Sequence, residues 1–119
     1  MKISKELLSG VLKLHILEYS CNGHNLYYDY FKDGVTYTSY NMTVGELAYK
    51  IEDWIESKDI NVIRIKENKL YEFYINAYID EETNELFFEN SITSETKIKG
   101  IIAVGEFILK EINEKQLQH

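Results

Sequence analysis

Residues 43–57 read TVGELAYKIEDWIES. The apolar residues of this segment recur every three or four positions and form one stripe, which predicts an amphipathic helix. The stripe consists of Val44, Leu47, Ala48, Ile51, Trp54 and Ile55. Thr43 and Glu46 have the spacing of a capping box, in which a hydroxyl and a carboxylate each accept a hydrogen bond from a backbone N–H. The helix is expected to bury one face in a core.

A second helix is predicted over residues 94–116. Its apolar positions are Ile98, Ile101, Ile102, Gly105, Ile108, Leu109 and Ile112. Gly100 and Gly105 each weaken a helix by about 1 kcal/mol relative to alanine, so we expect them to permit close packing against a sheet. Phe107 lies outside the main stripe, and the resulting wide apolar surface predicts a homodimer. Two ion pairs are expected on the exposed side: Glu106 with Lys110, and Glu111 with Lys115.

Strands are predicted between these two helices. Residues 70–79 alternate in polarity, which is typical of a half-buried strand. One face carries Tyr71, Phe73, Ile75, Ala77 and Ile79, and the other carries Glu72, Tyr74, Asn76 and Tyr78. Residues 80–85 predict a hairpin loop that leads into a strand at 86–89. Residues 60–66 are apolar on both faces, which predicts a strand in the interior of the sheet.

The region before the first quoted helix predicts a hairpin of residues 26–31 and 35–40. Asp33-Gly34 supplies the positive φ of a tight turn. Further upstream we expect a short helix at residues 4–10 and then a strand to about residue 20. The order is therefore α-β-β-β-α-β-β-β-α. This order predicts one α+β domain of residues 1–119, in which about six antiparallel strands in hairpins pack on two main helices.

Composition restricts the classes of function. The chain has 119 residues, enough for one domain with its own core, and a formal net charge of -7. An acidic chain speaks against direct binding of nucleic acid or of an anionic membrane, since both require a basic face. No apolar run reaches the roughly 20 residues of a membrane span, and no signal peptide is recognisable. A single cysteine suits a reducing cytoplasm.

Glu46-Leu47-Ala48, followed by Lys50 and Trp54, forms a pattern on the predicted helix. Together with the Ser94-Glu95-Thr96 segment before the last helix, it resembles small phage and prophage proteins of unknown function from bacteria with AT-rich genomes. In that group the last helix opens after a Thr-Glu pair and often contains a tryptophan; here the pair is Ser94-Glu95, and Phe107 stands near the tryptophan position. The resemblance covers about the last two-thirds of the chain. It implies a mobile-element origin and a bacterial host cytoplasm, and no chemistry.

No residue pattern indicates catalysis or a cofactor. Cys21 with His24 or His15 is the one candidate nucleophile–base pair, and no orienting group stands at a recognisable spacing. A structural metal site needs about four ligands, and the chain lacks a second cysteine. The Asp80, Glu82, Asn84 series lacks the glycine of a calcium loop. We therefore expect a protein that is not an enzyme and that holds neither metal nor cofactor.

The unusual feature is tyrosine, with ten in the chain. Tyrosine favours strands, so sheet structure alone accounts for many of these residues. It is also enriched at protein interfaces, which makes a binding face the alternative. The acids near residues 80–85 and the few cations near residue 64 extend this candidate surface. The candidate binding residues are Tyr28, Tyr30, Tyr37, Arg64, Lys66, Tyr74, Asn76, Tyr78, Asp80, Glu81, Glu82 and Glu85.

Three hypotheses follow for function. The first is a phage or prophage protein that binds a host defence protein and inhibits it stoichiometrically, as anti-CRISPR proteins do. An acidic surface can compete for a groove that normally holds nucleic acid. The second is an oligomeric protein that sequesters a small nucleotide signal, with Arg64, Lys66 and Lys69 as its cations. The third is an enzyme, which ranks last because no nucleophile, base and orienting group can be identified together. A structural or packaging accessory of a phage is kept as a further alternative.

Overall fold

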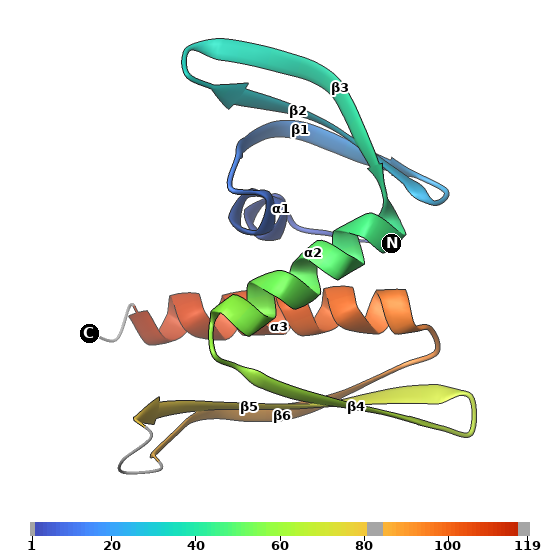
Figure 1. Cartoon of the computed structure of the whole chain (residues 1–119), viewed down its shortest axis with the longest axis vertical. Helices are drawn as coiled ribbons and strands as arrows, with labels where there is room; N and C mark the ends of the chain where they lie inside the picture. Colours follow the sequence, from blue (N-terminus) through green and yellow to red (C-terminus); the bar gives the residue numbers. More distant parts are fainter. Residues whose placement is uncertain (1, 81–84, 117–119) are drawn as a thin grey trace.

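The computed structural model shows two three-stranded antiparallel sheets with a layer of helices between them (Figure 1). It describes residues 2–80 and 85–116, and the side chains of residues 2–77 and 88–114. The elements are α1 (Lys5–Leu12), β1 (His15–Asn22), β2 (Asn25–Lys32), β3 (Val35–Thr43), α2 (Val44–Ser57), β4 (Asn61–Glu67), β5 (Leu70–Asp80), β6 (Glu85–Ser94) and α3 (Lys97–Gln116). The α+β class and the order of elements are confirmed.

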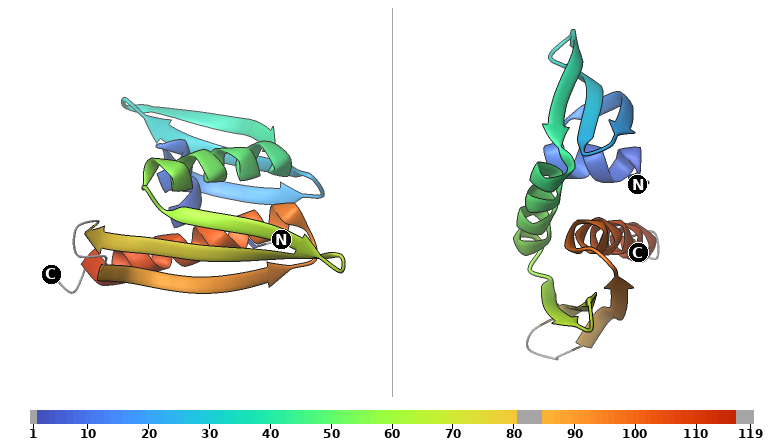
Figure 2. Two further views of the ribbon diagram at one scale, coloured as in Figure 1. Left: turned by 60° about the horizontal axis from the view of Figure 1, so that its bottom comes forward. Right: turned by 90° about the vertical axis from the view of Figure 1, so that its right-hand side faces the viewer.

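The six strands are divided between two sheets rather than joined in one. The first sheet has the order β1-β2-β3 and the second has the order β4-β5-β6. The division arises because α2 follows β3 without a linker and carries the chain across the helix layer, so that β4 begins on the far side (Figures 1 and 2). Each sheet turns one face, here called the inner face, toward the helices.

Short turns fix the hairpins. Asp33 and Gly34 adopt φ values of 53° and 79°, which is the two-residue turn that the sequence predicts between β2 and β3. Gly23, with φ 63°, supplies the positive φ of the turn between β1 and β2. Because every strand pairs with its neighbour in sequence, the hydrophobic alternation of each hairpin decides which side meets the helices.

The stripe of α2 is buried along its whole length, as predicted. The Thr43 hydroxyl accepts a hydrogen bond from the Glu46 backbone N–H at 3.0 Å. The same hydroxyl donates to Glu46 Oε1 at 3.3 Å, so the carboxylate meets the threonine side chain and not a backbone N–H. The Val44 N–H instead donates to the carbonyl of His24 at 2.8 Å, which joins the start of α2 to the β1–β2 turn.

The last helix begins at Lys97 and not at residue 94, because β6 extends to Ser94. Thr96 Oγ1 accepts from the Lys99 N–H at 3.2 Å and caps the first turn. Gly100 lies against the ring of Phe73 in the second sheet, as the packing expectation requires. Gly105 lies against Ile51 of α2 and Leu7 of α1, so this second glycine permits contact between helices rather than with a sheet.

Two expectations about the surface of α3 are revised. Glu106 Oε1 accepts from the backbone N–H of Ser4 at 2.8 Å and thereby ties the N-terminus to α3, while Lys110 Nζ lies 4.0 Å from Glu114 Oε1. The side chain of Lys115 lies outside the described residues. Phe107 packs edge to face on Phe88 of β6, with ring centroids 5.7 Å apart. Its place outside the stripe thus has a cause within the chain and no longer argues for a homodimer.

The prediction that residues 60–66 form an interior strand was wrong. In the structure β4 is an edge strand of the second sheet. Ile63 is 49% exposed and Ile65 is 45% exposed, both on the outer face. Apolar residues on both faces are typical of a strand with neighbours on both edges. In the described part of the chain, β4 has a neighbouring strand on one edge only.

Among the described helices, none has the length and hydropathy of a membrane span.

Candidate functional site

Four tyrosines gather on the inner face of the first sheet: Tyr28, Tyr30, Tyr37 and Tyr40. Tyr28 pairs with Tyr40 across β2 and β3, and Tyr30 pairs with Tyr37. Tyr30 and Tyr37 stack with ring centroids 4.8 Å apart and an angle of 13° between the rings. Tyr40 meets Tyr30 edge to face, with centroids 5.1 Å apart. Aromatic contacts of this kind each contribute about 0.5–1.5 kcal/mol beyond their buried area.

A β-bulge creates this cluster. Tyr37 and Tyr40 are three residues apart, so a regular strand would place them on opposite faces. Between the two pairs β2 advances by two residues and β3 by three, which turns both tyrosines to one side. Ser39 within the bulge has φ 60°, and its N–H donates to Asp29 Oδ1 at 2.9 Å. The Asp29 carboxylate therefore holds the conformation on which the cluster depends.

The cluster leads out to the surface of the molecule. Tyr28 is buried, Tyr30 and Tyr37 are half-buried, and Tyr40 is 44% exposed. The outer face of β2 also exposes Tyr27 and Phe31, and Val35 is exposed on the same face as Tyr37. Figure 1 shows the β2–β3 turn at the edge of the molecule, beyond α1. Residues 27–40, here called the tyrosine hairpin, are thus apolar on both faces.

Burial raises the pKa of two of the four hydroxyls, those of Tyr28 and Tyr30. It raises the pKa of Tyr28, and the nearby Tyr40 raises it further. Burial also raises the pKa of Tyr30, with additional effects from its hydrogen bond to Tyr40 and from the charges of its neighbours. Tyr28 and Tyr30 therefore keep their protons to higher pH than an exposed tyrosine does.

We expect Tyr28 and Tyr30 to lose their protons above pH 10.0, the ordinary value for tyrosine. Because the unfolded chain releases these protons at lower pH than the folded chain, their contribution to stability is complete below pH 10.0 and declines as the pH rises beyond it. An absorbance titration of tyrosinate should show a late component that Tyr28→Phe and Tyr30→Phe each diminish. A single transition near pH 10.0 for all tyrosines would contradict this expectation.

The other predicted tyrosine surface lies elsewhere. Tyr74 is on the outer face of the second sheet, across the helix layer from the tyrosine hairpin, and its hydroxyl donates to Glu72. That hydrogen bond and the charge of Glu72 raise the pKa of Tyr74. Asn76 is half-buried on the same face. The side chains of Tyr78, Asp80, Glu81, Glu82 and Glu85 lie outside the described residues.

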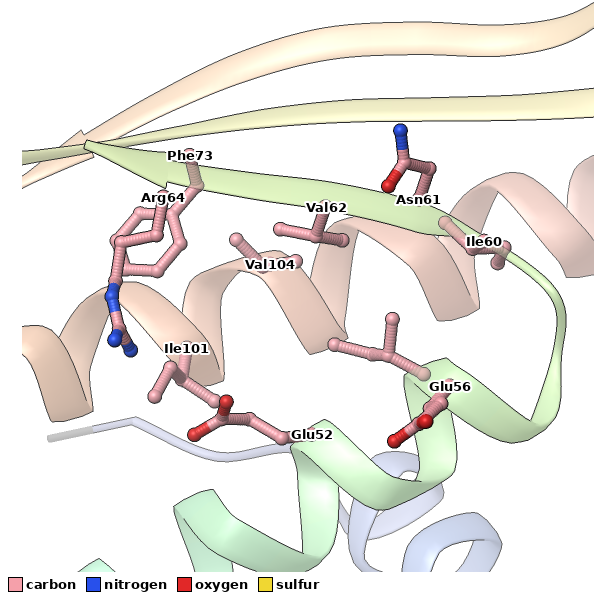
Figure 3. Close-up of a pocket in the computed structure, with 10 residues that line it drawn as sticks. Glu52, Glu56, Ile60, Asn61, Val62, Arg64, Phe73, Ile101 and Val104 are labelled. Carbon is pink, nitrogen blue, oxygen red and sulfur yellow. The ribbon is translucent and has the colours of Figure 1, made fainter.

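Arg64 lines a groove between β4, α2 and α3 with a volume of about 500 Å³. Figure 3 shows its guanidinium directed toward α2, where Glu52 and Glu56 form the opposite wall. Lys66 is not part of this lining; its Nζ lies 5.2 Å from the centre of the Tyr71 ring. Two carboxylates in the groove oppose a phosphate ligand, so the surroundings of Arg64 favour nucleotide binding less than its sequence position suggested.

Sequence reasoning missed Glu52 and Glu56 as site residues. Both belong to the polar side of α2, and only the position of β4 reveals that this side forms a wall of a groove.

The Cys21–His24 pair is not brought together as a site. Cys21 is half-buried and packs against the core from the inner face of β1, whereas His24 is exposed in the β1–β2 turn. Among the described residues, no three His, Cys, Asp or Glu side chains are placed to share a metal ion.

No protein-family model, curated protein or solved structure matches the chain.

Proposed function

We propose that this chain is a non-catalytic binding protein that forms a stoichiometric complex with another protein through its tyrosine hairpin. The observation that carries the proposal is the bulge-built cluster, which leads from buried Tyr28 to exposed Tyr40. A rigid aromatic surface suits binding, because its side chains lose little rotamer entropy when a partner covers them. Stacking of Tyr30 on Tyr37 holds part of that surface in place before the partner arrives.

Charge limits the kind of partner. The net charge of -7 steers the chain toward basic surfaces and away from acidic ones. Proteins that bind nucleic acid carry basic surfaces of this kind. A partner of this type would lose access to its nucleic acid while the complex lasts.

The narrower form of the proposal is inhibition of a bacterial defence protein by a phage- or prophage-encoded chain. Three features support it: the resemblance noted for Glu46-Leu47-Ala48 and Trp54, the small size, and the acidic balance. An inhibitor that occupies a nucleic-acid groove needs no catalytic residues, and the described residues provide no metal cluster for chemistry.

The test is capture of a partner by the tagged chain from a bacterial lysate, followed by measurement of the affinity of the purified complex. We expect Phe31→Ala with Tyr40→Ala to weaken binding at least about 30-fold, equivalent to roughly 2 kcal/mol for loss of a hot spot. The matched control is Tyr49→Ala. Tyr49 is 69% exposed on α2, away from the hairpin, and its removal should change affinity less than about twofold.

Equal losses in the hairpin variant and in the Tyr49→Ala control would contradict a role for the tyrosine hairpin. Absence of any one-to-one complex, combined with a defined oligomer and a rise in melting temperature on addition of cyclic nucleotides, would replace the proposal with nucleotide sequestration. Light scattering on the free chain supplies the oligomeric state that separates these outcomes.

A further inference from the structure

The edge of β4 is open. The strand pairs with β5 along all seven of its residues, and no described strand pairs with its other side. An edge strand presents a row of backbone N–H and C=O groups on which another extended chain can add. Charged side chains usually protect such edges. β4 carries Arg64 and Lys66 on its inner face and Glu67 at its end, while Ile63 and Ile65 on its outer face are about half exposed.

A groove runs along this same edge, on the inner side of β4. Its apolar lining is contributed by Ile55, Ile60, Val62, Phe73, Ile101 and Val104. Figure 2 shows α2 and β4 on the same side of the molecule, one above the other, with α3 beside α2 and over β5 and β6. A strand added beside β4 would therefore point alternate side chains into the groove and the others to the outer face.

The charges of the groove indicate which side chain fits. Glu52 and Glu56 are four residues apart on α2, so they lie on one face and repel one another. In the described part of the chain the one ion pair is Lys110 with Glu114, so neither carboxylate is paired. Arg64 lies toward Glu52, while Glu56 is at the Ile60 end (Figure 3). Both carboxylates are exposed, and two acids against one base give the groove a net negative charge that favours a cation.

A lysine or arginine side chain matches both parts of the groove. Its methylene stem can lie on the apolar lining while its charged head reaches the carboxylates. A second copy of this chain is the competing occupant of the edge, and the oligomeric state of the free chain distinguishes it from a segment of another protein.

We propose that β4 accepts an extended segment of another protein as a fourth strand of the second sheet, with a lysine or arginine of that segment between Glu52 and Glu56. This site goes beyond the proposed function, since it lies across the helix layer from the tyrosine hairpin. It gives the chain a second binding site. This site recognises an extended backbone through strand pairing and one basic side chain through the two carboxylates.

The probe is a capped seven-residue peptide, Thr-Val-Thr-Lys-Thr-Val-Thr, matched in length to β4. Its alternation places Val, Lys and Val on one side, whichever direction it runs. Two further peptides serve as controls. In the first, Glu replaces Lys. In the second, Pro replaces each of the two Thr residues that flank Lys. Amide chemical shifts of the full chain are followed by NMR during titration. We expect shifts concentrated in β4 and α2, and binding of the Lys peptide at least about tenfold tighter than either control.

Charge reversal makes the test specific. Glu52→Lys with Glu56→Lys should invert the preference, so that the Glu peptide binds more tightly than the Lys peptide. Glu6→Lys with Asp53→Lys changes the net charge equally, at two exposed acids outside the groove lining, and should leave the preference for Lys. Undisturbed β4 amides, an equal affinity for the proline peptide, or a preference that does not invert would each overturn the site. A dimer of the free chain that buries β4 would overturn it as well. None of these results depends on the tyrosine hairpin.

Discussion

Gly100→Ala is expected to lower the free energy of unfolding by about 3 kcal/mol, at the upper end of what overpacking costs. A Cβ at this position would lie 2.2 Å from Cε2 of Phe73 and 2.7 Å from its Cζ. Phe73 is only 2% exposed, and its ring also lines the groove beside β4. The methyl group therefore requires the ring to shift or α3 to separate from the second sheet. Urea denaturation of both proteins measures the difference.

Gly10→Ala is the matched control for the same chemical change. Gly10 lies in α1, and a Cβ there would meet its nearest neighbour, Trp54 Nε1, at 4.0 Å. Relief of the glycine penalty should then raise stability by about 0.5–1 kcal/mol. In the Gly100→Ala background, Phe73→Leu should cost less than it does in the wild type, because the smaller side chain relieves the clash. Equal stability of Gly100→Ala and wild type would contradict the close contact.

Ile51→Ala is expected to lower the free energy of unfolding by about 3–4 kcal/mol. Ile51 is fully buried, and its Cγ2 lies 2.9 Å from the position of a Cβ on Gly105. It therefore fills the contact between α2 and α3, and its loss leaves a cavity in the layer on which both sheets rest. The same denaturation experiment, followed by Trp54 fluorescence and by far-ultraviolet circular dichroism, measures the loss.

Both probes should report one coincident transition, in the wild type and in Ile51→Ala, because the two sheets share this helix layer. Two separate transitions would show that the sheets unfold independently, and the single-domain prediction for residues 1–119 would then be wrong. Ile63→Ala supplies the comparison. That side chain is 49% exposed on the outer face, so its removal should cost less than about 1 kcal/mol.

Much of the fold was predictable because local patterns carry it. The stripe of α2 and the Asp33-Gly34 turn identify a helix and a hairpin without reference to the rest of the chain. Residues 60–66 could not be assigned correctly in the same way. Periodicity tells which faces of a strand are apolar, but not whether a neighbour stands beside it, and that depends on how the sheets divide.

The candidate site was predictable only in its residue type. The sequence indicates that tyrosines gather near residues 27–40, but counting by two places Tyr37 and Tyr40 on opposite faces. One extra residue in β3, held by the Asp29–Ser39 hydrogen bond, reverses that result. Arg64 was predicted as a cation near a sheet, and its carboxylate neighbours were not, because α2 and β4 meet only in the folded chain.

The hydrogen bond from Ser4 to Glu106 spans 102 residues of sequence, whereas each strand of either sheet pairs with its immediate neighbour along the chain. Hairpins of this kind close small loops, and chains dominated by local contacts reach the native state quickly. Joining the N-terminal segment to α3 closes by far the larger loop. We therefore expect the hairpins to form before the two chain ends dock, and we expect that docking to be the slower step in maturation after synthesis.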